Sequence, residues 1–491
     1  MSSRIYANLG FLLQIAGLLT VLPIGVGLFL NETEAVVSLF LACVAFLGCG
    51  FLLNALCERK DLDFKSSNVL FLASFIVLPL IGALPYFYMD PFNSTNMAER
   101  FSNGIFESVS GFTTTGFSFV TNPEVLPKSL LIYRSMTELM GGIGLVFLLL
   151  AFFQSKKKSM EVYGNSIGVD NVNGDLKKTF LSVFAIYSGY IIAFTVIFYA
   201  LGFTNLINTG TFMIDTITGG FQPSEQQFQQ FLGLAPKIFL IVLMLLGSLN
   251  FAFSYNLFTR KPKKAFSWEI VVFFLIIILG TVSFSFLGGI NVLDSLFHVV
   301  SMSSSTGFYF IPLTSLSSTL LSILIVLMLI GGCTFSMAGG IRVSRLIASV
   351  KSVKESIKSI LIKEQVLPEE QHPLLKNNSS DMADYLSAPV IIILFTVVLV
   401  IFAVIFTTIG VSFTDALFEV GSALTTNGIS IGVRATNVLM PIGYKWLMIA
   451  AMTIGRVEIL SILIALSAYR SKAPSEASSG WLSRVRKQRS T

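Results

Sequence analysis

Residues 103–117 read NGIFESVSGFTTTGF, and two later stretches of the chain repeat this pattern without a gap. Residues 294–308 read DSLFHVVSMSSSTGF, and residues 415–429 read DALFEVGSALTTNGI. Residues 207–221, INTGTFMIDTITGGF, form a degenerate copy of the repeat, which keeps a Thr and a pair of Gly residues near its end. A unit that recurs four times predicts a fold built from four similar pieces that pack against one another.

Long apolar segments flank every copy, and each could cross a bilayer core of about 30 Å as a helix. The segments are 8–30, 35–56, 67–89, 130–153, 180–202, 238–259, 269–288, 319–340, 389–411 and 443–468. A Gly lies in the segment after each copy, at positions 142, 247, 332 and 455. Each unit is therefore expected to be an outer helix, a short half-helix, a Gly-containing turn and a second helix.

The composition excludes an ordinary soluble domain. Hydrophobic residues make up 54% of the chain and charged residues only 12%, whereas soluble domains carry about 25% charged residues. The net charge of +6 does not indicate nucleic-acid binding, because most Lys and Arg residues fall in alternate loops between the apolar segments. Under the positive-inside rule, this placement predicts that both termini are cytoplasmic. The first 30 residues lack a small-residue cleavage site and are expected to remain as a helix.

The predicted fold class is an all-α polytopic membrane protein. Four pseudo-symmetric helix–pore-loop–helix repeats surround one pore, and two extra transmembrane helices precede them. The expected divisions are 1–60 for the extra helices, 61–160 for repeat 1, 161–264 for repeat 2, 265–365 for repeat 3 with an intramembrane gating loop, and 366–491 for repeat 4 with a basic tail.

Polar residues open three of the half-helices. Asn103, Asp294 and Asp415 are predicted to be N-caps that accept hydrogen bonds from the first free N–H groups. If these caps lie at the outer surface, the C-terminal end of each half-helix points to the membrane centre. The negative end of each helix dipole then favours a cation there.

The turns after the half-helices are the candidate ion site. Non-helical backbone at membrane depth is tolerated only beside protein or a water-filled path, and carbonyl groups of such turns can replace the hydration shell of an ion. Glycine permits the backbone dihedrals that such a turn needs. Hard oxygen ligands without a carboxylate cage suit a monovalent ion better than calcium. The candidate residues are Thr114, Thr115, Gly116, Thr218, Gly219, Gly220, Ser305, Thr306, Gly307, Thr426, Asn427 and Gly428.

These four turns resemble the selectivity filters of the Trk/Ktr/HKT potassium-transporter superfamily, over nearly the whole chain. The two extra N-terminal helices resemble the Trk branch rather than the shorter Ktr branch. The resemblance implies potassium as the transported ion, uptake across a bacterial cytoplasmic (inner) membrane, and a homodimer with one pore per subunit. It also implies control by a cytoplasmic, TrkA-like ring that binds nucleotide.

The segment 331–340, GGCTFSMAGG, interrupts the second helix of repeat 3. Each interior Gly costs a helix about 1 kcal/mol relative to Ala, so the segment is expected to be a mobile loop within the membrane. Close helix contact through small residues is the alternative. In Trk-like proteins the matching segment lies below the filter as a gate. The candidate gate residues are Gly331, Gly332, Thr334, Ser336, Gly339 and Gly340.

Arg456 lies within the last span, where an uncompensated Arg costs at least about 2.5–3.5 kcal/mol. It could form an ion pair with Glu458 or another carboxylate. We favour a position under the filter, with hydrogen bonds to carbonyl groups of the 331–340 loop, as resemblance to the family's Arg in the last repeat implies. Arg456 and the loop would then form the closed barrier together.

Three further assignments concern Glu107 and Glu419, the pair Arg134 and Glu138, and the Cys residues. Glu107 and Glu419 are expected to support the filter through hydrogen bonds rather than to attract ions directly. Arg134 and Glu138, four residues apart on one helix, are expected to form a local ion pair. The four Cys residues are expected to be buried, reduced thiols.

A sodium- or proton-coupled potassium transporter of the Ktr/HKT type and a less selective monovalent cation channel stay open. A secondary transporter with inverted repeats is disfavoured, because the loop charges give all four repeats the same orientation. An enzyme is not expected, since two His residues cannot supply a catalytic cluster. No phosphate-binding G-x-x-x-x-G-K-[ST] motif occurs, so a nucleotide would be bound by a partner and not by this chain.

The basic-then-acidic segment 341–388 is the longest predicted cytoplasmic loop. A solvated connector or a contact with anionic lipid would account for its charges. The family resemblance implies instead that the regulatory ring docks on this face.

Overall fold

The computed structural model describes residues 2–57, 64–120, 122–154, 176–223, 225–259, 265–361, 379–431 and 440–470. Every regular element in these ranges is helical, in agreement with the predicted class. Six helices are long and apolar enough to cross a membrane, and two bent helix pairs raise this number to eight. The chain is a multi-pass membrane protein. The predicted division points at residues 60, 160, 264 and 365 and the basic tail lie outside the described residues.

An N-terminal hairpin precedes four units that share one order of elements: an outer helix, a half-helix, a turn and a second helix. The hairpin consists of α1 (Ser2–Leu19), α2 (Val21–Phe29) and α3 (Thr33–Leu56). Repeat 1 consists of α4 (Phe64–Gly82), α5 (Leu84–Met89), α6 (Met97–Phe112), η1 (Pro123–Val125) and α7 (Lys128–Gln154). Repeat 2 consists of α9 (Leu176–Ala200), α10 (Leu206–Thr218), α11 (Glu225–Gln230), α12 (Leu234–Ser248) and α13 (Phe251–Phe258).

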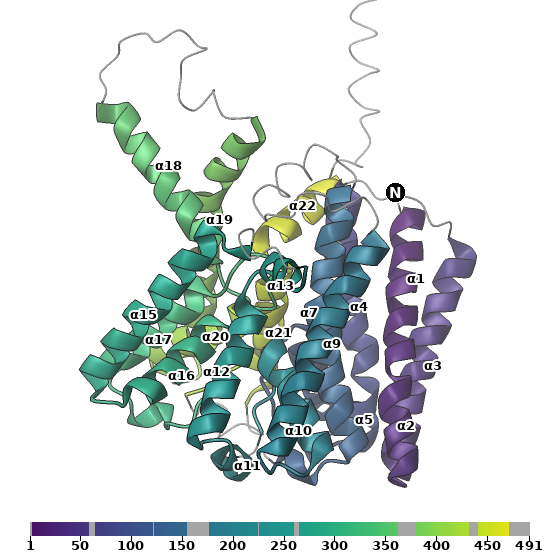
Figure 1. The fold of residues 1–491 in the computed structure, drawn as a ribbon. Helices are drawn as coiled ribbons and strands as arrows, with labels where there is room; N and C mark the ends of the chain where they lie inside the picture. The colour runs from purple at the N-terminus through teal and green to yellow at the C-terminus, as the bar shows by residue number, and fades with distance from the viewer. Residues whose placement is uncertain are drawn as a thin grey trace, which may run out of the picture.

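The last two units follow the same order. Repeat 3 consists of α15 (Trp268–Gly288), α16 (Val292–Ser303), η2 (Leu313–Ser315), α17 (Ser318–Ile330) and α18 (Val343–Leu361). Repeat 4 consists of α19 (Ser379–Thr407), α20 (Phe413–Leu424), α21 (Ile442–Val457) and α22 (Ile459–Arg470). The half-helices α10 and α16 begin near one face of the bundle, called the filter face here (Figure 1). Helices α18 and α22 and the N-terminus lie at the opposite face (Figure 1).

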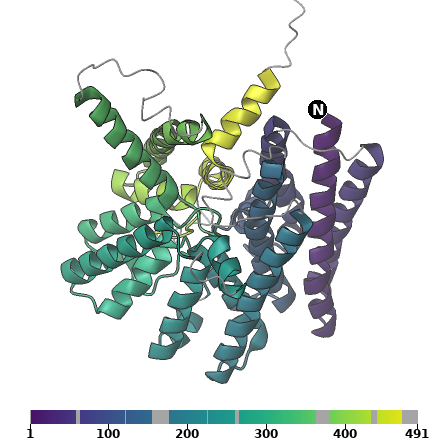
Figure 2. The same ribbon diagram turned by 45° about the horizontal axis from the view of Figure 1, so that its top comes forward.

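The repeats are arranged side by side around the half-helices, and the N-terminal hairpin lies at the edge of the bundle beside repeat 1. Figure 2 shows this arrangement from a second direction. Contacts join α10 to α7 and α12 to α16, so each half-helix packs against the second helix of the repeat before it. Helices α21 and α6 also pack together, which closes the series from repeat 4 back to repeat 1.

Two predicted straight spans are wrong. The segment 238–259 is a pair of helices, α12 and α13, that meet at 106°, and 443–468 is the pair α21 and α22, which meet at 88°. At the first bend Leu249 is extended and the Asn250 side chain accepts a hydrogen bond from the Ala252 N–H, so a new helix starts there. At the second bend Glu458 adopts φ 66°. Within the predicted span 319–340, the helix ends at Ile330.

The predicted N-caps are also wrong. The caps are Asn96, Asn291 and Ser412, whose side chains accept hydrogen bonds from the N–H groups at the helix starts. Asp294 and Asp415 lie in the first turn of their helices, where a negative charge still favours the helix dipole. Asn103 lies well inside α6 and accepts a hydrogen bond from another repeat.

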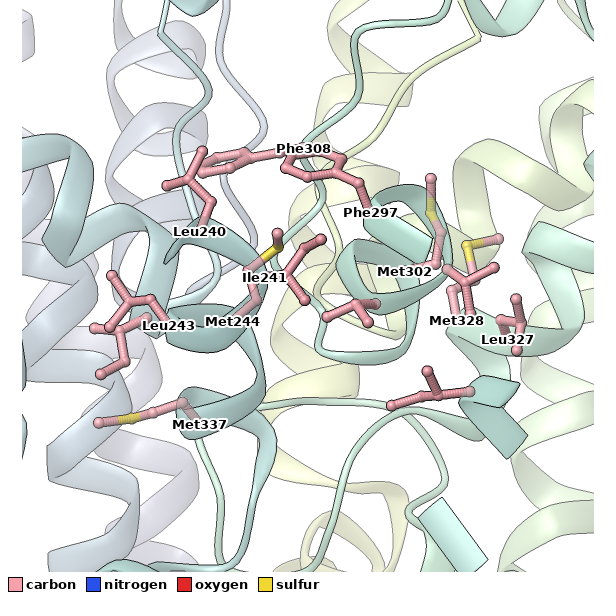
Figure 3. Packing of buried hydrophobic residues seen from close by; sticks show 14 of the residues in the cluster. Leu240, Ile241, Leu243, Met244, Phe297, Met302, Phe308, Leu327, Met328 and Met337 are labelled. Carbon is pink, nitrogen blue, oxygen red and sulfur yellow. The ribbon is translucent and has the colours of Figure 1, made fainter. Parts of the chain in front are cut away.

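Buried apolar side chains fill the space between the repeats. Figure 3 shows part of the largest cluster, to which α12 contributes Leu240 and Met244 and α16 contributes Phe297 and Met302, with Met302 beside Met328. Phe308, which follows the turn of repeat 3, stacks on Phe212 of α10 at 5.2 Å between ring centroids. These contacts hold the turns of repeats 2 and 3 against rigid helices.

The N-terminal hairpin is attached to repeat 1 through Glu32. Its carboxylate accepts hydrogen bonds from the N–H groups of Lys128 (2.7 Å) and Ser129 (2.9 Å), which are the first residues of α7. A carboxylate at this place satisfies free donors and complements the helix dipole.

Replacing Glu32 by Ala is therefore expected to destabilise the protein by about 1–2 kcal/mol, the usual cost of losing a cap. The midpoint of thermal unfolding in detergent, followed by scanning fluorimetry, measures this loss. Glu34→Ala is the matched control, since Glu34 is exposed in the first turn of α3. Equal midpoints for the two variants would contradict a capping role.

Candidate functional site: a ring of four glycine turns

The four predicted turns meet around one axis, and their glycines show it. A Cβ added at Gly116 would lie 2.3 Å from the carbonyl oxygen of Gly220, and one added at Gly219 would lie 2.3 Å from that of Ser305. A Cβ at Gly307 would lie 1.8 Å from the carbonyl oxygen of Asn427. One at Gly428 would lie 1.8 Å from that of Thr115. Each turn therefore touches the next one in the order 1–2–3–4–1, which is a closed ring.

The backbone of the turns is conformationally unusual in the same way in three repeats. Thr114, Ser305 and Thr426 have φ of 54°, 59° and 53°, and the glycines two residues later have φ of 80°, 77° and 71°. The residues between them (Thr115, Thr306 and Asn427) do not have positive φ. A left-handed non-Gly residue costs about 1–3 kcal/mol and persists only where its surroundings impose it. The turn of the degenerate repeat 2 differs, because its left-handed residue is a glycine, Gly219 (φ 79°).

Two hydroxyl groups at the ring have no hydrogen-bond partner in the described part of the chain. Thr114 and Thr426 are buried, and their Oγ1 atoms are unpartnered. The Oγ of Ser305 accepts a hydrogen bond from the Gly339 N–H at 3.0 Å. Buried hydroxyl oxygens nearly always have a partner, so these two atoms are free to contact an ion or water.

In repeats 1 and 4, a side chain nine residues before the last glycine of the turn (Gly116 or Gly428) holds the chain just after the turn. In repeat 1, Glu107 accepts hydrogen bonds from Ser118 Oγ (2.7 Å) and the Phe119 N–H (3.2 Å). In repeat 4, Glu419 accepts them from Ser430 Oγ and from the Ile431 N–H (2.9 Å). The expected support by Glu107 and Glu419 matches these contacts.

His298 occupies the same position in repeat 3 and was not among the predicted support residues. Its Nε2 accepts hydrogen bonds from the N–H groups of Phe310 (3.4 Å) and Ile311 (3.5 Å), while Nδ1 faces the Asp294 carbonyl at 2.7 Å. The alignment of the repeats is the sequence signal that could have identified it.

Repeat 2 is braced from outside. The residue three after Gly220 is Pro223, which has no N–H to donate, and the residue nine before Gly220 is Thr211. The carboxylate of Glu138, on α7 of repeat 1, accepts hydrogen bonds from the Phe221 N–H (3.0 Å) and Thr218 Oγ1 (3.2 Å). This contact was not predicted, because Glu138 and Phe221 lie in different repeats.

The predicted local pair of Arg134 and Glu138 is wrong. Arg134 instead forms a buried ion pair with Glu107, with 2.7 Å between Nη2 and Oε1, and its guanidinium lies 4.0 Å from the ring centre of Phe221. The side chains of Arg134 and Glu138 thus brace the turns of two different repeats.

Two lysines tie half-helices to a neighbouring repeat and were also missed. Lys445 of α21 donates a hydrogen bond to Asn103 Oδ1 of α6 at 2.8 Å and lies 3.6 Å from a carboxylate oxygen of Glu99. Lys237 of α12 pairs with Asp294 of α16 at 2.6 Å. Each lysine lies ten residues before the inner-helix glycine of its repeat, at 455 and 247, which is the signal in the sequence.

Replacing Lys445 by Met is expected to destabilise the protein by about 3 kcal/mol, because it leaves the charge of Glu99 without its buried partner. The double variant Lys445→Met/Glu99→Gln should recover most of this loss. Thermal unfolding in detergent measures both, with Lys351→Met on the exposed side of α18 as the control. A double variant no more stable than Lys445→Met alone would rule out the charge pair as the cause.

The segment 331–340 is a loop, as predicted, and it lies directly under the ring. Gly331, Phe335 and Gly340 have φ of 70°, 56° and 83°. A Cβ at Gly339 would lie 2.4 Å from Thr426 Oγ1. The N–H groups of Cys333 and Met337 donate to the carbonyl oxygens of Ser248 and Gly247, both at 3.0 Å. Figure 3 shows Met337 beside α12 at one end of the apolar cluster.

The remaining predicted loop residues hold the loop to its surroundings. Thr334 donates hydrogen bonds through its N–H (2.7 Å) and Oγ1 (2.9 Å) to the carboxylate of Glu269 on α15. Ser336 Oγ donates to the Cys333 carbonyl within the loop at 2.6 Å. Gly332 packs against Ser248 at the bend between α12 and α13. The loop is therefore attached to repeats 2 and 3 as well as to the ring.

Arg456 is buried and binds the loop. Its Nη1 donates to the Met337 carbonyl at 3.0 Å, and its Nη2 donates to the Gly141 carbonyl of α7 at 3.2 Å. The hydrogen bond to a loop carbonyl agrees with the favoured expectation. The alternative ion pair with Glu458 is not formed, because Glu458 pairs with Arg342 (3.0 Å) and with Arg345 of α18.

The chain is similar over most of its length to known cation transport proteins. A family model described as TrkH, cation transport protein, matches residues 35–271 and 265–479. A protein described as an uncharacterised cation transporter of Methanocaldococcus jannaschii is 28% identical over 461 residues, which cover 93% of each chain. The Trk system potassium uptake protein TrkG of Escherichia coli is 27% identical over 94% of this chain and 96% of its own.

A solved structure shows the same fold. The potassium transporter TrkH from Vibrio parahaemolyticus matches with a TM-score of 0.79 and 22% sequence identity. The match covers 95% of this chain and 98% of that chain. At this level of identity the likeness concerns the arrangement of the helices.

Proposed function

The chain belongs to the TrkH family of cation transport proteins, and we propose that it carries potassium ions across the membrane through the ring of four glycine turns. The relatives named as Trk potassium uptake proteins support potassium as the cargo. The proposed ligands are the carbonyl oxygens of the turns, together with the unpartnered hydroxyl groups of Thr114 and Thr426.

The observation that carries this proposal is the closed contact of the turns. Main-chain carbonyl oxygens from every repeat lie next to a glycine of the neighbouring turn. A ring of carbonyl oxygens at membrane depth can replace the hydration shell of a monovalent cation. The C-terminal ends of α6, α16 and α20 lead directly into the turns, so their dipoles favour positive charge there.

The loop 331–340 and Arg456 are proposed as the gate. The loop contacts the ring at Ser305 and Thr426, and Arg456 holds it by the Met337 carbonyl. A guanidinium under the ring repels a cation that leaves it, and the loop occupies the same space. Opening would require the loop to break its hydrogen bonds with Arg456 and Ser305.

The filter face is proposed to be the outer side of a bacterial cytoplasmic membrane, with both termini inside. A homodimer with one pore in each subunit and a TrkA-like nucleotide-binding ring on the opposite face are proposed as the assembly. The ion pairs of Glu458 with Arg342 and Arg345 favour a docking place near α18, because they join this helix to the bend below Arg456.

Rubidium uptake into liposomes that contain the purified protein tests the proposal. A potassium gradient sets the driving force. Gradients of sodium and of choline replace it in the control experiments. The expected result is rubidium uptake that depends on the protein and exceeds sodium uptake. Equal uptake of rubidium and sodium would favour a less selective cation channel, and no uptake with or without the regulatory ring would reject the proposal.

A further inference from the structure

Two side chains of the ring reach from their own turn to the half-helix of the repeat before it. Both belong to the residue immediately before the last glycine of a turn. Asn427 of repeat 4 donates a hydrogen bond through Nδ2 to the Met302 carbonyl of α16, at 3.0 Å. Thr306 of repeat 3 donates one through Oγ1 to the Thr216 carbonyl of α10, at 3.2 Å. Each contact joins two neighbouring repeats through a side chain, in addition to the main-chain contacts of the ring.

The two carbonyl groups that accept these hydrogen bonds lie in the last turn of a half-helix. Met302 is the second residue from the end of α16, and Thr216 is the third from the end of α10; Figure 3 labels Met302 on its helix. Carbonyl groups in the last turn have no partner within the helix, and a buried polar group without a partner is costly. Asn427 and Thr306 are each 1% exposed. The next repeat therefore supplies a donor that the helix end lacks, at a place shielded from water.

Residue 427 is an asparagine where repeats 1 and 3 have a threonine. Thr115 Oγ1 and Thr306 Oγ1 each hydrogen-bond to the hydroxyl group two residues earlier in their own turn, at 2.7 Å and 2.8 Å. Asn427 reaches another repeat instead. Its amide cannot be turned round, because Oδ1 would then face the Met302 carbonyl oxygen and neither atom could donate. The longer side chain at position 427 therefore serves the contact with α16.

The contact at Met302 lies where the turn of repeat 3 begins. The Met302 carbonyl also accepts a hydrogen bond from the Ser305 N–H at 3.4 Å, and Ser305 is the left-handed residue of this turn, with φ 59°. The carbonyl oxygen of Asn427 itself lies against Gly307, 1.8 Å from an added Cβ. Asn427 thus contacts the turn of repeat 3 with its main chain and fixes the start of the same turn with its side chain.

We propose that the side chains of Asn427 and Thr306 determine specificity by position: they hold the turns of repeats 2, 3 and 4 at the spacing that favours potassium over sodium. The proposal rests on the proposed function, since this spacing matters only if ions pass the ring. Carbonyl oxygens replace the hydration shell of an ion, and the smaller sodium ion needs them closer together. Turns that are held apart by a neighbouring half-helix cannot follow the smaller ion, so sodium gains fewer contacts.

Rubidium and sodium uptake into liposomes tests this role. Asn427→Thr has the shorter side chain of repeats 1 and 3, and Thr306→Val loses one hydroxyl group with little change of shape. The ratio of rubidium to sodium uptake should fall about tenfold in Asn427→Thr and about threefold in Thr306→Val, the range that the loss of one hydrogen bond covers. The ratio should fall because sodium uptake rises. Thr396→Val, at an exposed site of α19, is the control and should keep the ratio.

Three results would overturn the inference. An unchanged ratio in Asn427→Thr would show that its side chain does not set the spacing. An equal loss of rubidium and sodium uptake would show a structural role only. A loss of rubidium uptake with sodium uptake unchanged would show that Asn427 binds the ion directly. If Asn427→Thr does not fold, Thr306→Val decides by the same three results.

Amide hydrogen exchange separates this inference from the proposed function. The N–H groups of residues 304–307, followed by mass spectrometry in detergent, should exchange faster in Asn427→Thr than in the unaltered protein or Thr396→Val, because the start of the turn opens more easily. This measurement requires folded protein but no ion flux. Unchanged exchange would overturn the inference even where the unaltered protein transports selectively. No uptake of either ion by the unaltered protein, with or without the regulatory ring, would reject the proposed function and the inference with it.

Discussion

Replacing Gly428 by Ala is expected to abolish selective rubidium uptake, with a loss of at least about 100-fold. The added Cβ would lie 1.8 Å from the carbonyl oxygen of Thr115 and 2.9 Å from the carbonyl carbon of Gly116. The φ of 71° adds strain, because an L-residue rarely adopts this conformation. Since both neighbours are main chain of the ring, no side-chain rotation can relieve the clash.

Gly443→Ala is the matched control for this change. Gly443 lies at the start of α21 in the same repeat, and no atom lies within 4 Å of an added Cβ. Rubidium and sodium uptake into liposomes, normalised to folded protein from gel filtration, measures both variants. Normal, selective uptake by Gly428→Ala would show that the turns do not form the ion path.

Replacing Arg456 by Ala is expected to raise rubidium flux in the absence of any regulator by about 30-fold or more. The change removes two hydrogen bonds from a charged donor, to Met337 and Gly141. Each is worth about 1.5–3 kcal/mol. The closed state loses this stabilisation, and the barrier that a fixed positive charge presents to a cation disappears with it.

A second substitution distinguishes charge from hydrogen bonding. Arg456→Lys keeps the positive charge but cannot donate in two directions from a planar group, so it should give an intermediate flux. Lys351→Ala, on the exposed part of α18, controls for the loss of a positive charge elsewhere. If Arg456→Ala leaves both the flux and its dependence on a regulatory subunit unchanged, the gate has been assigned to the wrong residue.

Predictions from local sequence features agreed best with the structure. The number of repeats, the position of each turn and the break at 331–340 depend on hydropathy and on glycine, whose effects act within a few residues. The sites of Glu107 and Glu419 were also recognisable, because each braces its own repeat, with the acceptor 11 or 12 residues from its donors. The N-cap predictions were wrong because several polar residues lie near the start of each half-helix, and the sequence does not show at which of them the helix begins.

Hydrogen-bond partners that come from another repeat could not be predicted from local sequence features. Glu138 and its donor Phe221 are 83 residues apart, Arg456 and Gly141 are 315 apart, and Lys445 and Asn103 are 342 apart. Arg134 and Glu138 carry opposite charges at a favourable spacing, yet Arg134 pairs with Glu107 and Glu138 holds the turn of repeat 2. A weak surface pair of that spacing is worth only a few tenths of a kcal/mol, less than satisfying buried groups.

The sequence by itself determined that this chain is an all-helical membrane protein with four glycine turns, because hydropathy, repeat spacing and glycine dihedrals are properties of short segments. Only the tertiary structure decided which side chains brace which turn, where α12 and α21 bend, and which carbonyl groups Arg456 binds. These depend on burial and on distances between segments far apart in the chain, where the cost of an unpaired polar group in a low-dielectric interior selects the partner.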